Sequence, residues 1–509
     1  MHFYSIENKR FVIAQNNKQN GIIEKIVSLS KRKGFVFQSS EIYGGLNGCW
    51  DYGPLGVELL NNIKSEWWKF MTYKDDVEGL DASILMHPRV WEASGHVENF
   101  TDPMIDCKVC KARFRLDTLA EFIGDKKKEK ILRHFLQDLK EKKSKSTVFA
   151  EGIIFSGDDL NEKFTSLLEN DELAPELLKE ISCPQCGSKE SFTKPKSFNL
   201  MFKTFLGPVE KEGNTIYLRP ETAQGIFVNF LNVQSASRQK LPFGIAQIGK
   251  AFRNEINTKN FLFRTREFEQ MEMQYFVRPS DDKKWYDEWK EKRMGWYLSL
   301  GIAQDKLRFH DHPPNKLAHY AKEATDIEYR FPFGWGEIEG IHNRTDFDLS
   351  RHEEYSGKSQ KYYDEELKEK YIPYIIETSA GASRSFMAFL VNAYHEEEVN
   401  GETRVVLKLH PKLAPIKVAI LPLVNKDGMP EVAKKIEADL RPFLKVFYDS
   451  KGAVGRRYRR QDEAGTPFCI TVDTQTLQDN TVTVRERDSM EQERINIDEL
   501  LNYLLNKLR

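Results

Sequence analysis

The stretch from Phe243 to Phe276 concentrates side chains that could bind a nucleotide. Its pattern predicts two β-strands joined by a polar loop, the first ending near Arg253 and the second beginning near Phe263. Side chains two residues apart in a strand point to the same face. The face shared in this way on the second strand carries Arg264, Arg266, Phe268, Gln270 and Glu272. A strand that only builds core would carry β-branched or aromatic residues there instead.

Each of these side-chain types has a use in nucleotide binding. A guanidinium binds phosphate oxygens bidentately, an aromatic ring stacks on a base, and a carboxylate accepts a hydrogen bond from an amine or a ribose hydroxyl. A surface hairpin held by ion pairs is the simpler interpretation for any two of these residues. The complete set favours a nucleotide platform: Arg253 and Glu255 before the loop, then Arg264, Phe268 and Glu272 after it.

Three further segments carry candidate site residues. Glu221 follows a predicted strand, and Arg384 opens a predicted helix directly after the small-residue turn around Gly381. Glu337 and Glu339 are expected on one face of another strand, where paired carboxylates would suit Mg²⁺ beside a triphosphate. The alternative is that one of these two carboxylates binds the amino group of a substrate.

Four of the six cysteines form two CxxC pairs. The pairs are Cys107 with Cys110, and Cys183 with Cys186. In a reducing compartment this spacing favours a metal over disulfides, and four thiolates predict a tetrahedral structural zinc. Segment 111–182 reads as charged helices, so the two pairs could meet at its base. A catalytic zinc would need an open coordination position and a nearby base, and the sequence indicates neither.

The composition is that of an ordinary globular protein. The 509 residues suggest two to four domains, with 40% hydrophobic and 30% charged residues. No apolar run approaches the roughly 18–20 residues that span a bilayer, and the N-terminus lacks the apolar segment of a signal peptide. We therefore expect a cytoplasmic protein without a membrane partner. Because the formal net charge is −1, any RNA-binding surface must be a local patch.

The central hairpin resembles motif 2 of class II aminoacyl-tRNA synthetases, and the segments around it resemble the glycyl-tRNA synthetase family. Those segments are SSEIYGGLNGCWDYGPLGVELLNNI at 39–63, YLRPETAQGIF at 217–227, GWGEIEGIHNRTDFDL at 334–349, ETSAGASR at 377–384 and LKLHPKLAPIKVAILPL at 407–423. The resemblance preserves their order from about Gly21 to near the C-terminus. It implies a glycine–tRNA ligase that uses ATP with Mg²⁺ to form glycyl-adenylate and then charges tRNA(Gly).

The resemblance also implies a fold. It predicts an α+β catalytic domain on an antiparallel sheet, with a Cys-rich helical insertion and a C-terminal α/β anticodon-binding domain. The expected parts are a polar leader at 1–20, catalytic segments at 21–106 and 191–405, the insertion at 107–190, and the anticodon-binding domain at 406–509. A further insertion near 280–325 is expected to approach the tRNA acceptor end. The long helix of motif 1, in the first catalytic segment, implies a homodimer.

The family's functional residues transfer position by position. The implied catalytic residues are Arg253, Glu255 and Arg384. The implied ATP site comprises Arg253, Asn254, Glu255, Phe263, Arg264, Thr265, Arg266, Glu267, Phe268, Glu337, Ile338, Gly381, Ala382, Ser383 and Arg384. The implied glycine site comprises Arg115, Glu221, Phe268, Glu269, Gln270, Met271, Glu272, Glu377, Thr378, Ser379, Ala380 and Gly381. Many members have Pro and Asp where this chain has Thr378 and Ser383, which puts the hydrogen bonding of that turn in question.

A basic helix near Arg456, Arg457, Arg459 and Arg460 concentrates positive charge in the predicted anticodon-binding domain. A charge run is often only a solvated face, but in the family this domain holds the tRNA anticodon. Three rival functions remain open at this stage. They are a synthetase-like binding protein without catalysis, a synthetase for threonine, serine or proline, and a protein that mainly binds RNA.

Overall fold

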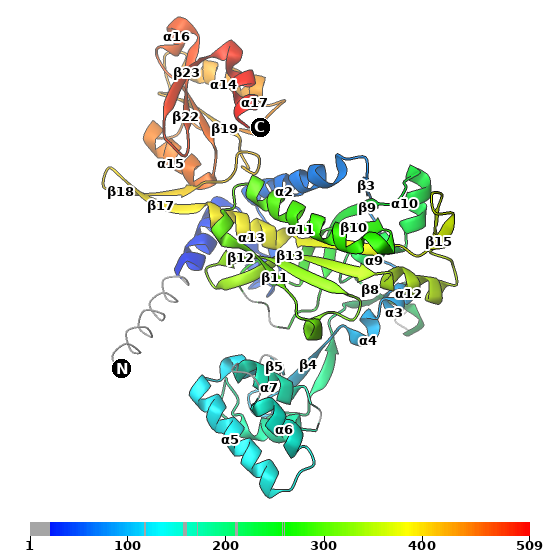
Figure 1. Ribbon diagram of the computed structural model, residues 1–509. Coiled ribbons are helices and arrows are strands. Elements are labelled where there is room, and N and C mark those ends of the chain that lie inside the picture. Colours follow the sequence, from blue (N-terminus) through cyan, green and yellow to red (C-terminus); the bar gives the residue numbers. More distant parts are fainter. Residues whose placement is uncertain are drawn as a thin grey trace. The chain divides into compact units, whose positions relative to one another are not determined.

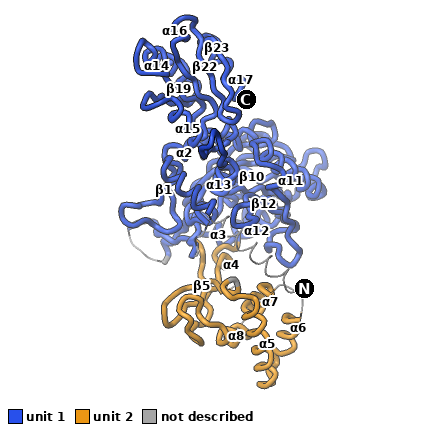
Figure 2. The backbone as a smooth tube through the Cα atoms, turned by 90° about the vertical axis from the view of Figure 1, so that its left-hand side faces the viewer, with its two compact units in different colours: residues 1–94, 202–509 blue, residues 95–201 orange. Residues whose placement is uncertain are grey.

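The computed structural model describes residues 21–508 except 117–118, 156–159, 171, 209–211, 257 and 259. The predicted leader at 1–20 lies outside the described residues. The chain divides into two compact units (Figure 2): unit 1 comprises Met1–Ser94 and Phe202–Arg509, and unit 2 comprises Gly95–Met201. In the described part of the chain, no helix combines the length and hydropathy that crossing a bilayer requires.

Unit 1 is organised around a seven-stranded sheet with the order β11-β12-β13-β16-β10-β9-β3. Its strands are β3 Val77–Gly79, β9 Phe243–Phe252, β10 Glu267–Val277, β11 Leu307–Asp311, β12 Glu323–Phe331, β13 Gly334–Thr345 and β16 Tyr374–Gly381. Every neighbouring pair is antiparallel except β3 with β9. The prediction of a catalytic domain on an antiparallel sheet is confirmed.

Three helices pack on one face of this sheet (Figure 1): α2 Pro54–Thr72, α11 Asp282–Ser299 and α13 Ala382–Ala393. The long helix α2 begins with proline at its first turn, where a missing N–H costs nothing. Met271 and Met273 of β10 join the buried core beneath these helices. Because side chains alternate along a strand, Phe268, Gln270 and Glu272 point to the opposite face.

Helix α11 corrects one prediction. The segment near 280–325 was expected to form an insertion directed at tRNA, but α11 lies against β13 and β16. Its aromatic side chains Trp289 and Tyr297 are fully buried, and Arg293 is buried beside them. The apolar side of this amphipathic helix faces the sheet, so the helix is a layer of the core.

Unit 2 has a hydrophobic core of its own. It contains the three-stranded sheet β5-β4-β6 and the helices α5 Asp125–Glu141, α6 Thr147–Ile154, α7 Leu160–Leu168 and α8 Ala174–Glu180. The strands are β4 Thr101–Asp106, β5 Arg113–Arg115 and β6 Lys196–Asn199. The unit extends beyond 107–190 on both sides because β4 and β6 pair with each other.

The C-terminal part of unit 1 forms a five-stranded sheet with the order β20-β19-β21-β22-β23. The strands are β19 Val418–Pro422, β20 Val446–Tyr448, β21 Phe468–Val472, β22 Thr481–Glu486 and β23 Gln492–Asn496, and α14 Met429–Leu440 and α17 Leu500–Lys507 share their core. The first three spatial neighbours are parallel and the last three antiparallel. The α/β prediction is confirmed, although the sheet is mixed.

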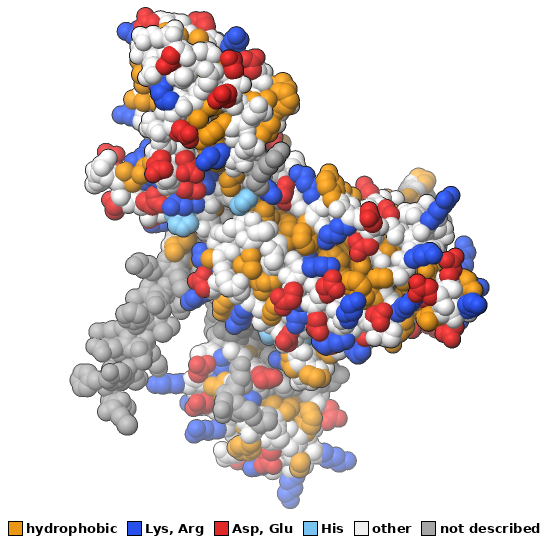
Figure 3. All heavy atoms as spheres, turned by 45° about the horizontal axis from the view of Figure 1, so that its top comes forward, with side chains coloured by type: hydrophobic (Ala, Val, Ile, Leu, Met, Phe, Trp, Pro, Cys, Tyr) orange, Lys and Arg blue, Asp and Glu red, His pale blue; other side chains and the backbone are white. Residues whose placement is uncertain are grey.

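The basic helix α15, Val454–Ala464, does not present all its arginines to solvent. Arg457 is 1% exposed and donates hydrogen bonds to the carbonyl oxygens of Pro422, Leu423 and Asp449. Arg457 therefore lies neither on a solvated face nor on an exposed RNA-binding surface, the two interpretations of the charge run, because it ties the helix to the sheet. On the face shown in Figure 3, side chains of both charge signs are interspersed.

Candidate active site

A pocket opens on the sheet face opposite α2, α11 and α13, where β10, β13 and β16 run side by side. Its lining combines strand residues with the loop between β9 and β10. The lining residues are Glu221, Arg253, Glu255, Leu262, Phe263, Arg264, Thr265, Phe268, Gln270, Glu272, Tyr320, Glu337, Gly340, His342, Glu377, Ser379, Gly381, Ser383 and Arg384. Most of the predicted site residues therefore meet in one place.

Strand register divides the lining into two halves. Ser379 lies opposite Glu272 on β10 and Gly340 on β13. Two residues further along the sheet, the next pair that faces the pocket is Glu377 on β16 with His342 on β13. We call Glu221, Glu272, His342, Glu377 and Ser379 the acidic half. We call Arg253, Phe263, Arg264, Phe268, Glu337 and Arg384, nearer the β9–β10 loop, the arginine half.

Glu272 is 2% exposed, and its described hydrogen-bond partners are neutral. Ser379 Oγ donates to Glu272 Oε1 over 2.6 Å, Gln270 Nε2 donates to the same oxygen over 3.0 Å, and the Thr222 hydroxyl donates to Oε2. Burial, reinforced by the charges of Glu377 and Glu221, raises the pKa of Glu272 to about 7. A cation arriving here would relieve that repulsion.

Glu377 is equally buried but has charged partners. Arg344 Nη1 donates to Oε2 over 3.0 Å, Gln274 Nε2 donates to the same oxygen over 2.7 Å, and His342 Nδ1 lies 2.9 Å from Oε1. Burial alone would raise the pKa of this carboxyl, but Arg344 and His342 outweigh it and hold the pKa at about 2. Glu377 is therefore ionised at neutral pH.

A buried polar bridge connects two of these carboxylates. Arg344, 2% exposed, donates two hydrogen bonds to Asp348, from Nε over 2.7 Å and from Nη2 over 3.0 Å. Gln224 Nε2 in turn donates to Asp348 over 3.0 Å and to Glu221 over 2.9 Å. The bridge thus runs from Glu377 to Glu221, and such fully bonded networks fix side-chain positions.

The arginine half is more open. Arg253 Nε donates to the carbonyl oxygen of Pro220 over 3.1 Å, and its guanidinium lies 5.3 Å from the ring centre of Phe268. Arg384 Nη1 lies 3.0 Å from Glu337 Oε2, with 23% of the arginine side chain exposed. Its positive charge is the main cause that lowers the pKa of Glu337. A phosphate group could accept hydrogen bonds from the guanidiniums of Arg253 and Arg384 in place of their present partners.

A β-bulge overturns the predicted pairing of Glu337 with Glu339. Ile327 of β12 lies opposite Glu339, whereas the next residue of β12, Glu328, lies opposite Glu337. The extra residue, Ile338, reverses the alternation of faces along β13. Glu337 consequently lines the pocket, and Glu339 points to the helix layer, fully buried in a bidentate ion pair with Arg293 at 2.6 and 3.0 Å. The two carboxylates do not form one magnesium site.

Several other predicted site residues have side chains outside the pocket lining: Asn254, Arg266, Glu267, Glu269, Met271, Ile338, Thr378, Ala380 and Ala382. Met271, Ile338, Ala380 and Ala382 belong to the core, while Glu267 and Glu269 pair with Lys250 and Lys64 on the far face. Arg266 precedes β10, and its Nε donates to the carbonyl oxygen of Glu255 over 2.8 Å. The predicted shared face of β10 holds only from Phe268 onward.

The departures from the family pattern at Thr378 and Ser383 have distinct surroundings. Ser383 lines the pocket and accepts a hydrogen bond from the hydroxyl of Tyr52 over 3.0 Å. Thr378 is fully buried in β16, between Met273 on β10 and Ile341 on β13. The serine therefore belongs to the site and the threonine to the sheet.

Sequence reasoning missed Leu262, Tyr320, Gly340 and His342 in the lining and Arg344 behind it. His342 and Arg344 lie in a segment that was singled out, but the bulge that directs His342 inward leaves no periodic signal. Tyr320 comes from a loop, and its ring lies 3.8 Å from the guanidinium carbon of Arg344. Arg115 lies on β5 of unit 2, with a guanidinium nitrogen 3.2 Å from a carboxylate oxygen of Asp102.

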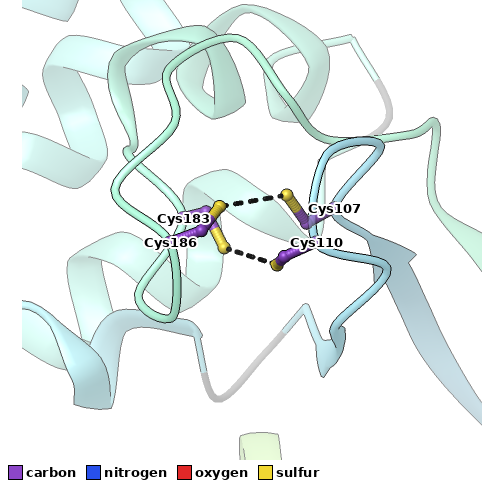
Figure 4. A group of neighbouring side chains, drawn as sticks. All are labelled: Cys107, Cys110, Cys183 and Cys186. Atoms are coloured by element: carbon purple, nitrogen blue, oxygen red, sulfur yellow. Dashed lines mark hydrogen bonds between the residues drawn. The ribbon is translucent and has the colours of Figure 1, made fainter.

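Unit 2 brings the four predicted cysteines together (Figure 4). Their sulfur atoms all lie within 4.8 Å of one another, and Cys107 with Cys186 and Cys110 with Cys183 are each 3.7 Å apart. Four thiolates about 2.3 Å from a tetrahedral zinc are about 3.8 Å apart, so the spacing fits that ion. The pKa of Cys107 is lowered to about 6, first by its hydrogen bond with Ser191.

An antiparallel sheet that presents arginines from its central hairpin and from the start of the following helix defines the core of a class II aminoacyl-tRNA synthetase. The match to family models agrees: residues 204–394 match the tRNA synthetase class II core domain (G, H, P, S and T). Residues 102–200 match glycyl-tRNA synthetase insertion domain 1, and residues 417–507 match an anticodon binding domain.

Curated relatives identify the particular family. The chain is 52% identical over 494 residues to the glycine–tRNA ligase of Treponema denticola, covering 96% of this chain and 97% of the relative. It is 49% identical to that of Streptomyces coelicolor and 53% identical to that of Geobacillus kaustophilus, covering 96% of this chain and 98% and 99% of the relatives. The chain belongs to the glycine–tRNA ligase family, as the sequence motifs predicted.

Proposed function

We propose that the pocket carries out both steps of glycine–tRNA ligation. As a member of its family, the chain is an ATP-dependent aminoacyl-tRNA ligase. The glycine carboxylate attacks the α-phosphorus of ATP, which forms glycyl-adenylate and releases pyrophosphate. The terminal ribose hydroxyl of tRNA(Gly) then attacks the activated carbonyl carbon and releases AMP. The observation that carries the proposal is one pocket with guanidiniums at one end and buried carboxylates at the other.

The arginine half takes ATP. Arg253 holds the α-phosphate as it becomes five-coordinate, and Arg264 and Arg384 hold the β- and γ-phosphates. Phe268 stacks on the adenine, and Glu255 accepts from the base or positions the tRNA end. These arginines act as preorganised positive charge, because an in-line displacement needs alignment and neutralisation rather than a covalent enzyme intermediate.

The acidic half takes glycine. Its carboxylates Glu221, Glu272 and Glu377 surround the ammonium group, and Ser379 holds Glu272 in place through the 2.6 Å hydrogen bond. A substrate without a side chain must be selected by the exclusion of larger ones. Because every competing amino acid is larger, a tight acidic half makes a separate editing site unnecessary.

The class uses ATP as its complex with Mg²⁺. Glu337 is the pocket carboxylate that would hold this ion together with phosphate oxygens, since Mg²⁺ prefers hard oxygen ligands. The ion would supply positive charge to the phosphates. Glu339 has no part in this, because Arg293 occupies both of its oxygens.

Glycine-dependent exchange of pyrophosphate into ATP tests the assignment, measured across all twenty amino acids. We expect exchange with glycine alone, lost in Arg253→Ala and in Glu377→Gln. Lys250→Ala is the matched control, because Lys250 lies on the same hairpin and pairs with Glu267 on the far face. Unchanged exchange in both site variants would overturn the assignment.

The four-cysteine cluster holds structural Zn²⁺ in this proposal, and the fit of the sulfur spacing supports it. Elemental analysis should find about one zinc per chain in the wild type and none in Cys107→Ser. Cys49→Ser, which alters a cysteine outside the cluster, should retain the metal. Full zinc content in Cys107→Ser would refute the site.

The remaining assignments follow from family membership. The proposed parts are a catalytic domain divided by the insertion at 95–201, which replaces the expected bounds 107–190, and the anticodon-binding domain 406–509, which contacts tRNA(Gly). Two chains pair through motif 1 as a homodimer in the cytoplasm, where tRNA charging takes place. Sedimentation at micromolar concentration should give the mass of two chains, and a species of 59.3 kDa would contradict the dimer.

A further inference from the structure

His342 occupies a position in the pocket that the β13 bulge creates. Without the bulge, regular alternation of β13 from Glu337 onward would direct Glu339 and Ile341 to the pocket. With it, Gly340 and His342 line the pocket instead. Bulges that redirect side chains are common beside active sites, so the feature points to a requirement for these two residues.

Gly340 makes room for the imidazole. A Cβ placed on Gly340 would lie 2.7 Å from Cε1 and 3.5 Å from Nε2 of His342, closer than packed atoms allow. The ring therefore lies directly over the Cα of Gly340. Ser379 is the register neighbour of Gly340, and Glu272 is the register neighbour of Ser379, so the ring lies next to the carboxylate-bearing rows of the acidic half.

Three contacts hold the ring in place. Its Nδ1 lies 2.9 Å from Glu377 Oε1, Gly340 lies beneath it, and the ring of Tyr320 meets it edge-on with centroids 6.3 Å apart. Only 18% of the His342 side chain is exposed. A side chain fixed on several sides cannot move aside without losing those contacts.

We propose that His342 is a specificity-determining residue whose imidazole, seated over Gly340 and hydrogen-bonded to Glu377, forms the wall that excludes amino acids with a β-carbon. The proposal rests on the assignment of the acidic half to the glycine ammonium group. An ammonium group bound by Glu377 would share that carboxylate with the imidazole, whose Nδ1 lies 2.9 Å from Glu377 Oε1. The Cα of the bound glycine is bonded directly to that ammonium nitrogen. A methyl group on that Cα would compete with the imidazole for space.

The test is the ratio of kcat/KM for glycine to kcat/KM for alanine in pyrophosphate exchange. Both values come from the same preparation, so any loss of folded protein cancels in the ratio. His342→Ala removes the wall, and we expect the ratio to fall about 10-fold or more, the usual worth of one methyl group in a fitted pocket. His342→Phe keeps a ring but loses the hydrogen bond, and should keep most of the selectivity.

Two results would overturn the wall. A ratio unchanged in His342→Ala would show that the ring excludes nothing, and an equal fall in His342→Ala and His342→Phe would assign the effect to the hydrogen bond with Glu377. A His342→Ala protein that activates neither amino acid would likewise contradict a role in selection. Failure of the underlying assignment is separately visible, because Glu377→Gln would then leave glycine activation unchanged.

Discussion

The acidic and arginine halves of the pocket hold their charges in different ways. Glu272 and Glu377 are 2% and 3% exposed, and side-chain hydrogen bonds tie Glu272 to Thr222 and Ser379 and tie Glu377 to His342. Arg264 and Arg384 have 33% and 23% of their side chains exposed, and Arg384 is held by Glu337 and two backbone carbonyls. The side chains of the acidic half are therefore fixed before the substrate binds. Those of the arginine half have partners that a phosphate group can replace.

The difference matches what each half must recognise. Glycine offers few atoms to bind, so its site must be rigid before the substrate arrives. The free energy needed to fix the buried charges is then supplied by folding and not by substrate binding. A triphosphate offers many charged oxygens, which can reorganise exposed guanidiniums on arrival. Substitutions in the acidic half should therefore affect stability as well as activity, whereas those in the arginine half should affect activity alone.

The largest effect is expected from Arg344→Met, which leaves Asp348 and Glu377 buried without their shared cation. We expect a loss of about 3–5 kcal/mol in the free energy of unfolding, measured by urea titration, together with loss of glycine activation. Lys240→Met is the control, since it breaks an exposed pair with Glu365. That pair should contribute less than about 1 kcal/mol. Equal losses in the two variants would show that the buried Arg344 network stabilises the fold no more than an exposed ion pair does, which would contradict the account of the acidic half.

Arg253→Ala tests the arginine half. We expect kcat for pyrophosphate exchange to fall about 10²–10³-fold, because one preorganised charge is lost from the transition state. The urea midpoint should stay close to that of the wild type, since Arg253 is only part-buried and its hydrogen bond to the Pro220 carbonyl is one backbone contact in the loop after β9. A large loss of stability with little loss of kcat would reverse the assignment.

The titration of Glu272 gives a smaller effect. Burial first, then Glu377 and Glu221, raise its pKa to about 7, so the carboxyl is ionised above that pH and neutral below it. Binding of the glycine ammonium should weaken as pH falls, and kcat/KM for glycine should drop up to about tenfold per unit below pH 7. Glu272→Gln should be low at all pH values and should flatten this slope. A slope retained in Glu272→Gln would assign it to another group.

The smallest effect is expected at the family departure Ser383. Ser383→Ala removes the hydrogen bond from Tyr52 and should cost about 0.5–1.5 kcal/mol of stability. Because the hydroxyl bonds Tyr52 rather than an arginine, KM for ATP should change less than about threefold on the scale of one neutral hydrogen bond. A tenfold rise in KM for ATP would place Ser383 in direct contact with the nucleotide.

Much of the site was predictable because it lies on regular strands. The spacing of Phe268, Gln270 and Glu272 indicated a shared face, and the structure gives all three to the pocket. The two CxxC pairs predicted that the four cysteines come together, because thiolates at this spacing bind one metal ion. That prediction did not require knowing how the helices between the pairs fold. The family motifs predicted Glu377 and Arg384 as site residues. These two lie on β16 and α13, outside the β9–β10 hairpin, so the pattern of the hairpin could not indicate them.

The remainder depends on tertiary packing. Nothing local marks the bulge at Ile338, so Glu337 and Glu339 were expected side by side although they point to opposite faces. Arg457 and Arg293 illustrate a second limit, because a buried arginine with backbone or carboxylate partners has the same sequence pattern as a solvated one. Such positions follow from how elements pack, which local periodicity does not encode.

The central claim is that the acidic half receives the amino group and the arginine half the phosphate. A crystal structure with a non-hydrolysable glycyl-adenylate analogue tests it most directly. We predict the amino group within about 2.6–3.2 Å of oxygens of Glu272 and Glu377, and the phosphate within hydrogen-bond reach of Arg253. An analogue bound with its amino group away from these carboxylates, or with its phosphate on the acidic half, would contradict the account.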